Sequence, residues 1–254
     1  KYFSLVKPLI LWINGGLMAI FFFLIGLEIK REIILGELNS IKKAVLPIFA
    51  ALGGMLIPLL LFLAINNNTE TTNGWGIPMA TDIAFTLAIL KLLGNKVNLS
   101  LKIFLTAFAI IDDIGAILII AIFYTQDISW ILLFYSGLLL IVLYILSYLR
   151  IYNKIILLIF GFIIWLLFLK SGVHPTVAGI LLAFAVPAKQ RISEFKYAQK
   201  LEKILNRITA SDNTNNLPLL SEKQISEINN LENLTKEVQS PLQNLEHRLH
   251  YWVA

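Results

Sequence analysis

Two adjacent aspartates, Asp112 and Asp113, interrupt an apolar run that extends over residues 101–124. A helix needs about 20 apolar residues to cross a bilayer, so this segment has the length of a membrane span and holds both carboxylates near its middle. Insertion scales assign a central aspartate a cost of roughly 2.5 to 3.5 kcal/mol, and each isoleucine, leucine or phenylalanine a gain of about 0.3 to 0.6 kcal/mol. The flanking residues therefore offset the pair, and the two acids predict a functional site inside the membrane.

A soluble α/β protein could also place two acids after a short buried strand, as caps of the following helix. The composition argues against this, because 57% of the 254 residues are hydrophobic and only 15% are charged, against roughly 25% in soluble domains. We therefore predict an all-α, polytopic membrane protein. Its net charge of +5 then concerns topology and anionic lipid headgroups, and does not indicate nucleic acid. The sequence has no cysteine, so it offers no disulfide, thiolate metal site or thiol nucleophile.

Seven apolar segments along the chain are candidate membrane spans. They cover residues 10–29, 44–65, 75–93, 101–124, 130–149, 155–169 and 173–186. Lysine and arginine lie mostly on one side of the implied topology, which the positive-inside rule assigns to the cytoplasm. We expect a transmembrane domain at 1–188, a cytoplasmic excursion at 189–240 and the start of a truncated further span at 241–254. The chain begins without methionine and stops as this last apolar run begins, so we expect a fragment.

The excursion differs from the spans in its mixed charge and its many asparagines. Its first half predicts an amphipathic helix from six apolar residues at helical spacing: Ile192, Phe195, Leu201, Ile204, Leu205 and Ile208. Ser221, followed three residues later by Gln224, predicts the capping box of a second helix. The two helices could pack on each other, lie on the membrane or meet another subunit.

The aspartate pair has a geometry suited to ion exchange. Adjacent residues of a helix point about 100° apart, so one of Asp112 and Asp113 can face a cavity while the other faces a neighbouring helix. A carboxylate pair in this position can hold protons and a cation in turn. Hard cations such as Na⁺ or Li⁺ prefer oxygen ligands, which carboxylates, a threonine hydroxyl and free backbone carbonyls supply.

The third apolar segment can supply such carbonyls. Pro78 precedes Thr81 and Asp82 within its apolar run, a pattern that favours a broken helix. A break leaves unpaired carbonyl and N–H groups, which the membrane interior tolerates only beside protein or a water-filled cavity. Asp82 would then balance the positive end of a half helix and add a charge near the pair. Alternatively, Thr81 or Asp82 is the N-cap of a helix that begins after Pro78.

Two groups of titratable residues lie at cytoplasmic ends of spans. The first comprises Glu28, Lys30, Arg31 and Glu32, and the second comprises Glu246, His247 and His250. Histidine titrates near physiological pH, so the second group suits a response to pH. The simpler interpretation of the first group is a solvated helix end that carries the positive-inside signal. His247 and His250 are spaced like metal ligands, but the sequence supplies no third ligand beside them.

Several motifs together resemble the NhaA family of bacterial sodium/proton antiporters. They are FFFLIGLEIKRE at 21–32, IPMATDIAF at 77–85, LKIFLTAFAIIDDIGAI at 101–117, LKSGVHPTVAG at 169–179 and SPLQNLEHRLH at 240–250. The resemblance extends from about Leu11 to the end of the chain, and residues 189–238 match poorly. It implies an inverted-repeat fold with discontinuous helices and a site at the membrane midplane, of which this family is itself a known example.

The resemblance also implies roles for individual residues. Asp112 and Asp113 are similar to the family's essential aspartate pair, with Asp113 as the direct cation ligand and both as proton carriers. Thr81 and Asp82 resemble the unwound part of the first discontinuous helix. The family's cytoplasmic pH-responsive cluster is matched by Glu28, Arg31, Glu32, Glu246, His247 and His250. In the family a lysine from a later helix pairs with the first aspartate, and we expect it, with a second broken helix, to lie beyond Ala254.

Two positions depart from the family pattern. Gly15 stands where aspartate is common in the family, so a helix contact expected at the periplasmic side would lack that side chain. Tyr251 stands where proline is common, which bears on how the last helix begins. Neither position touches the expected ion site.

The resemblance implies a secondary transporter of the bacterial inner membrane that expels Na⁺ or Li⁺ in exchange for protons and so regulates intracellular pH and Na⁺. We expect no cofactor, no enzymatic activity, surrounding membrane lipid and a possible homodimer. One alternative is a transporter-like protein that has become a sensor or scaffold. Another is an intramembrane aspartyl protease or metal-dependent prenyl transferase, but these chemistries need further acidic motifs, and the sequence around DDIGA offers none.

Overall fold

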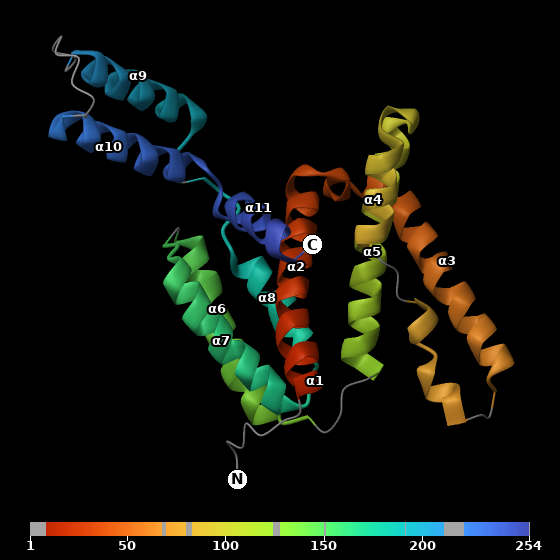
Figure 1. Ribbon diagram of the computed structural model, residues 1–254. Helices are drawn as coiled ribbons and strands as arrows, with labels where there is room; N and C mark the ends of the chain where they lie inside the picture. The colour runs from red at the N-terminus through yellow and green to blue at the C-terminus, as the bar shows by residue number, and fades with distance from the viewer. Residues whose placement is uncertain are drawn as a thin grey trace.

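The computed structural model describes residues 9–67, 70–79, 83–123, 128–149, 151–190, 192–210 and 221–253. Within these ranges the chain is built of helices and contains no strand, which confirms the all-α prediction (Figure 1). The α-helices are α1 (Leu9–Trp12), α2 (Met18–Leu35), α3 (Ile41–Ile65), α4 (Ile83–Leu93), α5 (Leu99–Phe123), α6 (Trp130–Tyr148), α7 (Lys154–Ser171), α8 (Thr176–Ala185), α9 (Glu194–Ala210), α10 (Glu222–Val238) and α11 (Pro241–Val253).

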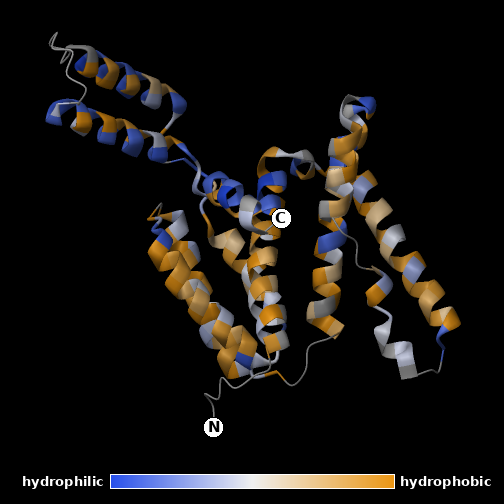
Figure 2. Cartoon of the chain, in the orientation of Figure 1, coloured by the Kyte–Doolittle hydropathy of each residue, from blue (hydrophilic) through white to orange (hydrophobic). Residues whose placement is uncertain are grey.

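Four of the described helices are long and apolar enough to cross a membrane. They are α3, α5 from Ser100 onward, α6 and α7, and the shorter apolar helix α8 joins them. These helices are hydrophobic along almost their whole length, whereas hydrophobic and hydrophilic residues alternate along α9 and α10 (Figure 2). Large side chains such as Phe49, Leu60 and Leu158 are mostly exposed. Such an apolar outer surface suits contact with lipid rather than water.

The closest helix packing joins α2 to α8. A Cβ atom added at Gly26 would lie 2.7 Å from the Ala183 Cβ and 3.1 Å from the Ile180 Cα. A Cβ atom at Gly179 would lie 3.0 Å from the Phe23 backbone nitrogen. Small residues at a helix crossing allow two backbones to approach closely, which is a common means of packing in membranes. These helices, with α6, α7 and α11, form one side of the bundle in Figure 1.

The other side of the bundle contains α3, α4 and α5, and α5 lies between α3 and α2 (Figure 1). Ile110 of α5 is buried against Ile25 and Ile29 of α2. On a different side of α5, Phe108 and Ile111 pack against a core of α3 and of the turn that precedes α4, built from Ala51, Met55 and Met79. The helix that carries the aspartate pair is therefore held by two separate apolar contacts.

The amino-terminal helix contains an irregular turn. Residues Ile13–Leu17 form a turn of π-helix between α1 and α2. The indole Nε1 of Trp165, on α7, donates a hydrogen bond of 2.6 Å to the carbonyl oxygen of Gly15 in this turn. Turns of this kind are rare and leave backbone groups available to partners outside the helix. Gly15, which departs from the family pattern, therefore contacts another helix through its backbone.

The described residues of the third predicted span form two kinds of helix. A short 3-10 turn covers Ile77–Met79, and α4 begins at Ile83. This change of helix type agrees with the predicted effect of Pro78. Thr81 and Asp82 lie outside the described residues, so their expected place in an unwound segment remains a prediction.

Helices α9 and α10 form an antiparallel hairpin that projects from the end of the bundle (Figure 1). Arg207 pairs with Glu227 at 3.5 Å, and the hydroxyls of Tyr197 and Thr235 lie 3.4 Å apart. Of the three arrangements left open by the sequence, the two helices pack on each other. The predicted capping box is present, since the Ser221 hydroxyl accepts from the Gln224 backbone nitrogen and the Gln224 side chain accepts from the Ser221 nitrogen.

Not every apolar residue expected on the packed face of α9 lies there. Ile204 is buried and Leu201 and Ile208 are partly buried, whereas Phe195 is 71% exposed and Leu205 is 49% exposed. The physical reason is geometric, because Phe195 and Leu205 lie on other faces of the helix than the line of contact with α10. Both ends of the hairpin meet at the bundle, where the Leu242 nitrogen donates to the Pro187 carbonyl oxygen at 3.2 Å.

Candidate functional site

The aspartate pair lies in the middle of α5. Asp112 is 1% exposed and Asp113 is partly buried. Residues three or four apart share a helix face, so Asp112 lies on the face of Phe108 and Gly115, near α3. Asp113 lies on the face of Ile110, which packs against α2. The two residues therefore lie on different faces of α5.

Close packing of α3 on α5 fixes the position of the pair. A Cβ atom added at Gly115 would overlap the Met55 sulfur, and the Phe108 ring would lie 3.5 Å from a Cβ atom at Gly54. Gly115 is three residues beyond Asp112, so the absence of a side chain there lets α3 approach beside the pair. A buried carboxylate is costly unless its charge is balanced by a proton, a cation or hydrogen bonds. A site with this chemistry can exchange protons for a hard cation.

A second cluster of charged residues joins α2 to α11 at the end of the bundle from which α9 and α10 project (Figure 1). The Arg31 guanidinium donates to Glu246 of α11 and, at 3.0 Å, to Glu32 of its own helix. The His250 Nδ1 atom lies 4.0 Å from the Glu28 carboxylate. The structure therefore brings together five of the six residues assigned to the pH-responsive cluster, from segments more than two hundred residues apart.

Burial changes the proton affinity of this cluster. Glu246 is 9% exposed, and this burial raises the pKa of its carboxyl above its ordinary value. The Arg31 guanidinium acts in the opposite direction and lowers the pKa, while the nearby Glu32 carboxylate raises it. A carboxyl whose proton affinity depends on a neighbouring arginine and a neighbouring acid can couple protonation to the contact between α2 and α11.

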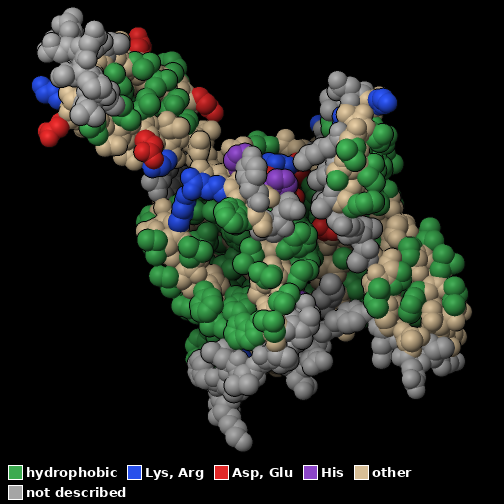
Figure 3. Space-filling model, in the orientation of Figure 1, with side chains coloured by type: hydrophobic (Ala, Val, Ile, Leu, Met, Phe, Trp, Pro, Cys, Tyr) green, Lys and Arg blue, Asp and Glu red, His purple; other side chains and the backbone are tan. Residues whose placement is uncertain are grey.

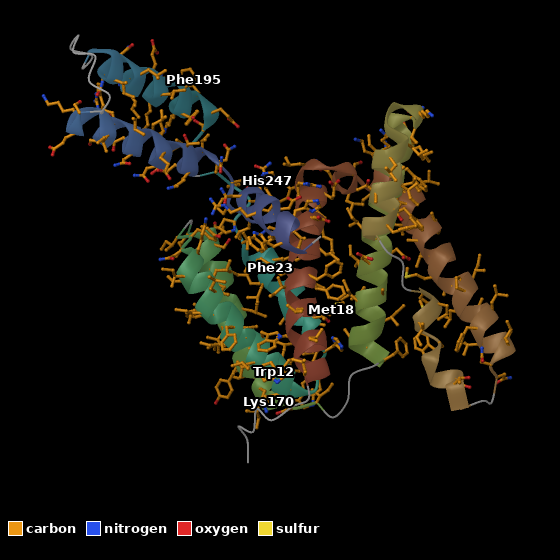
Figure 4. The ribbon with its side chains drawn as sticks, in the orientation of Figure 1. Trp12, Met18, Phe23, Lys170, Phe195 and His247 are labelled. Atoms are coloured by element: carbon orange, nitrogen blue, oxygen red, sulfur yellow. The ribbon has the colours of Figure 1, made fainter. Side chains whose placement is uncertain are left out.

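His247, the sixth residue of the cluster, lies on an exposed side of α11, three residues before His250 (Figure 4). The His247 side chain is exposed, whereas the neighbouring Glu246 is buried within the cluster.

One contact of this region was not anticipated from the sequence. The Lys30 ammonium donates to the carbonyl oxygens of Phe184 at 2.6 Å and Val186 at 2.5 Å. Both carbonyls belong to the carboxyl end of α8, where backbone carbonyls lack helical partners and the helix dipole favours a cation. Lys30 therefore ties α2 to the end of α8. The sequence showed Lys30 only as one member of a charged group at a helix end, because residue types do not reveal which backbone carbonyls a side chain will contact.

Comparisons with known proteins show the family to which the chain belongs. The profile of the family described as Na⁺/H⁺ antiporter 1 matches residues 1–254. The protein named Na(+)/H(+) antiporter NhaA from Oleidesulfovibrio alaskensis is 48% identical over 252 residues, which are 99% of this chain and 56% of that protein. The Na(+)/H(+) antiporter NhaA 1 of Saccharophagus degradans is 46% identical over 248 residues, 98% of this chain and 53% of that protein.

A third relative matches a shorter part of the chain. The Na(+)/H(+) antiporter NhaA 1 of Clostridium beijerinckii is 52% identical over 196 residues, 77% of this chain and 49% of that protein. The chain spans about half the length of the curated relatives it matches. These similarities confirm the resemblance found in the sequence motifs.

Proposed function

The chain belongs to the Na⁺/H⁺ antiporter family, and on this premise we propose that it forms the ion-binding half of a secondary active transporter that expels Na⁺ or Li⁺ in exchange for protons. The observation that carries the proposal is the buried aspartate pair in the middle of an apolar helix, with Asp112 1% exposed. Membrane-embedded acids of this kind mark ion pathways and proton relays. The names of the curated relatives support the same activity.

Protons and the cation compete for Asp112 and Asp113 in the proposed cycle. When the cytoplasmic pH rises, the pair releases protons and binds Na⁺, with Asp113 as the direct ligand. Movement of one group of helices against the other then exposes the site to the outside, where protons displace the cation. Thr81 and Asp82 contribute oxygen atoms from the interrupted third span.

The cytoplasmic cluster is proposed to make this cycle sensitive to pH. Arg31 holds Glu246 and Glu32, and Glu28 faces His250, so the contact between α2 and α11 changes with the protonation of these side chains. His247 belongs to the same proposed cluster from its exposed side. Rearrangement here reaches the aspartate pair through α2, which contacts α5 at Ile110.

Location and partners follow from the same premise. The four apolar helices and the family support a multi-pass membrane protein, and we place it in the bacterial inner membrane with lipid around the bundle. Its substrates are Na⁺ or Li⁺ and protons, it is a transporter and not an enzyme, and it works as a homodimer.

The test measures ion exchange in everted membrane vesicles that contain the complete gene product. A preformed pH gradient is monitored by a fluorescent dye while Na⁺, Li⁺ or K⁺ is added. We expect Na⁺ and Li⁺ to collapse the gradient with the native sequence and to have no effect with Asp113→Asn. The matched control is Asp127→Asn, a change outside the membrane spans predicted from the sequence. The absence of any response from correctly inserted native protein would refute the proposal and favour a sensor or scaffold.

A further inference from the structure

Two neighbouring cavities lie where the α9–α10 hairpin meets the bundle. The first, which we call the root cavity, has a volume of about 750 Å³ and lies between the end of α2, the segment after α8, and the first turns of α9 and α11. The second, of about 670 Å³, adjoins it and shares Ile34 and the segment 188–190. Volumes of 300 to 1,000 Å³ are typical of sites for small molecules.

Cations outnumber anions in the wall of the root cavity. Among the lining residues that the structure describes, Arg31, Lys189 and Lys196 are cationic and Glu194 alone is acidic. Lys and Arg side chains gather at this junction in Figure 3. Lys189 and Lys196 are exposed, and neither has a carboxylate within 4.0 Å among the described residues. Their charges are therefore available to a ligand.

The helices that open onto the root cavity add to its positive potential. Residues Ser193 and Glu194 begin α9, and Ser240 and Gln243 begin α11, so both helices present their amino-terminal ends to the same space. The amino-terminal end of a helix carries a partial positive charge and favours anions. The Ser240 hydroxyl accepts from the Gln243 nitrogen at 3.2 Å, so this end is already ordered.

Apolar residues form the remainder of the wall, among them Ile34, Leu35 and Ile192. We propose that the root cavity binds a phosphate group, carried by a soluble phosphate ester or by an anionic lipid headgroup. Lys189 and Lys196 meet it as point charges, and Arg31 offers the planar donor pair that suits phosphate oxygens. The apolar wall accommodates the organic part of the ligand.

Binding here bears on the cytoplasmic cluster, because Arg31 belongs to both sites. A phosphate group in the root cavity competes with Glu246 and Glu32 for the Arg31 guanidinium. This consequence for transport rests on the proposed function. Phosphate binding to the root cavity does not depend on the proposed function, so the binding is tested without measuring ion exchange.

The experiment measures binding by isothermal titration calorimetry to the purified complete protein in nanodiscs of phosphatidylcholine, at about 0.15 M salt to screen weak surface attraction. The probes are inorganic pyrophosphate and ATP. The cavity variant is Lys189→Gln/Lys196→Gln. The matched control is Lys200→Gln/Lys203→Gln, which removes two exposed lysines of α9 that lie outside the cavity. In a second experiment, native mass spectrometry measures how much phosphatidylglycerol remains bound to the native protein and to each variant.

We expect a probe to bind the native protein and the control variant alike, and the cavity variant at least tenfold more weakly. This result identifies a soluble phosphate ligand. Retention of phosphatidylglycerol by the native protein and the control, with loss from the cavity variant and no binding of either soluble probe, identifies a lipid headgroup. Equal binding by the cavity variant, or no binding of any phosphate compound, overturns the proposal. The four substituted lysines are exposed, so the fold of each variant is checked by its unliganded melting temperature.

Discussion

The crossing of α2 and α8 allows a quantitative test of the packing. Gly26→Ala adds a Cβ atom 2.7 Å from the Ala183 Cβ and 3.1 Å from the Ile180 Cα, whereas ordinary contact begins near 3.4 Å. The helices must therefore separate by about 0.7 Å. A gap of about 0.5 to 1 Å forfeits a quarter to a half of the dispersion energy of each contact across it. Forced separation of this kind costs roughly 1 to 3 kcal/mol.

Helix propensity acts in the opposite direction. Alanine is more favourable than glycine inside a helix by about 1 kcal/mol, so we expect Gly26→Ala to destabilise the protein by up to about 2 kcal/mol. Gly53→Ala in α3 is the matched control, because an added Cβ atom there has no neighbour within 4 Å. That change keeps the gain in propensity and should be neutral or stabilising.

The assay compares melting temperatures of the complete protein and the two variants in one detergent, by size-exclusion chromatography after heating. A difference of about 1 to 3 kcal/mol between Gly26→Ala and Gly53→Ala, the cost of the forced separation alone, corresponds to roughly 2 to 12 °C. Two variants that melt together would refute the reasoning. That result would show either that α2 and α8 do not cross at Gly26 or that they can separate there without a loss of stability.

Three further predictions concern the end of the bundle that carries α9, α10 and α11. Burial raises the pKa of Glu246, so its protonated form stabilises the fold below the ordinary value of 4.5, and this contribution is lost as pH rises through the raised value; we expect the stability of the native protein to fall relative to Glu246→Gln as the pH is raised above 4.5, and parallel melting curves would contradict this. Lys30→Met removes the cation from the two carbonyls at the end of α8, so amide hydrogen exchange should increase around Val186 but remain unchanged in Lys43→Met. Ser221→Ala removes an N-cap, which costs about 1 kcal/mol; exchange should increase in α10 alone, and an unchanged rate there would show that the cap contributes nothing.

Local properties of the sequence were sufficient for the secondary structure and for the position of the aspartate pair. Hydropathy marked the apolar helices, and the spacing of Ser221 and Gln224 marked the start of α10. The adjacency of Asp112 and Asp113 required that they point in different directions on one helix. These features depend on residues within a few turns of each other, so they can be read without knowing how the helices pack.

The tertiary structure alone decided which distant groups meet. Arg31 reaches Glu246 across 215 residues, and Lys30 caps α8 through backbone carbonyls that no residue type reveals. The resemblance to a known family had grouped the acids and histidines, but it could not indicate that Glu246 is buried while His247 is exposed. The root cavity likewise depends on the tertiary structure, because its wall joins residues of α2, of the segment after α8 and of the starts of α9 and α11. Such contacts depend on the angle and separation of packed helices, which hydropathy and periodicity do not encode.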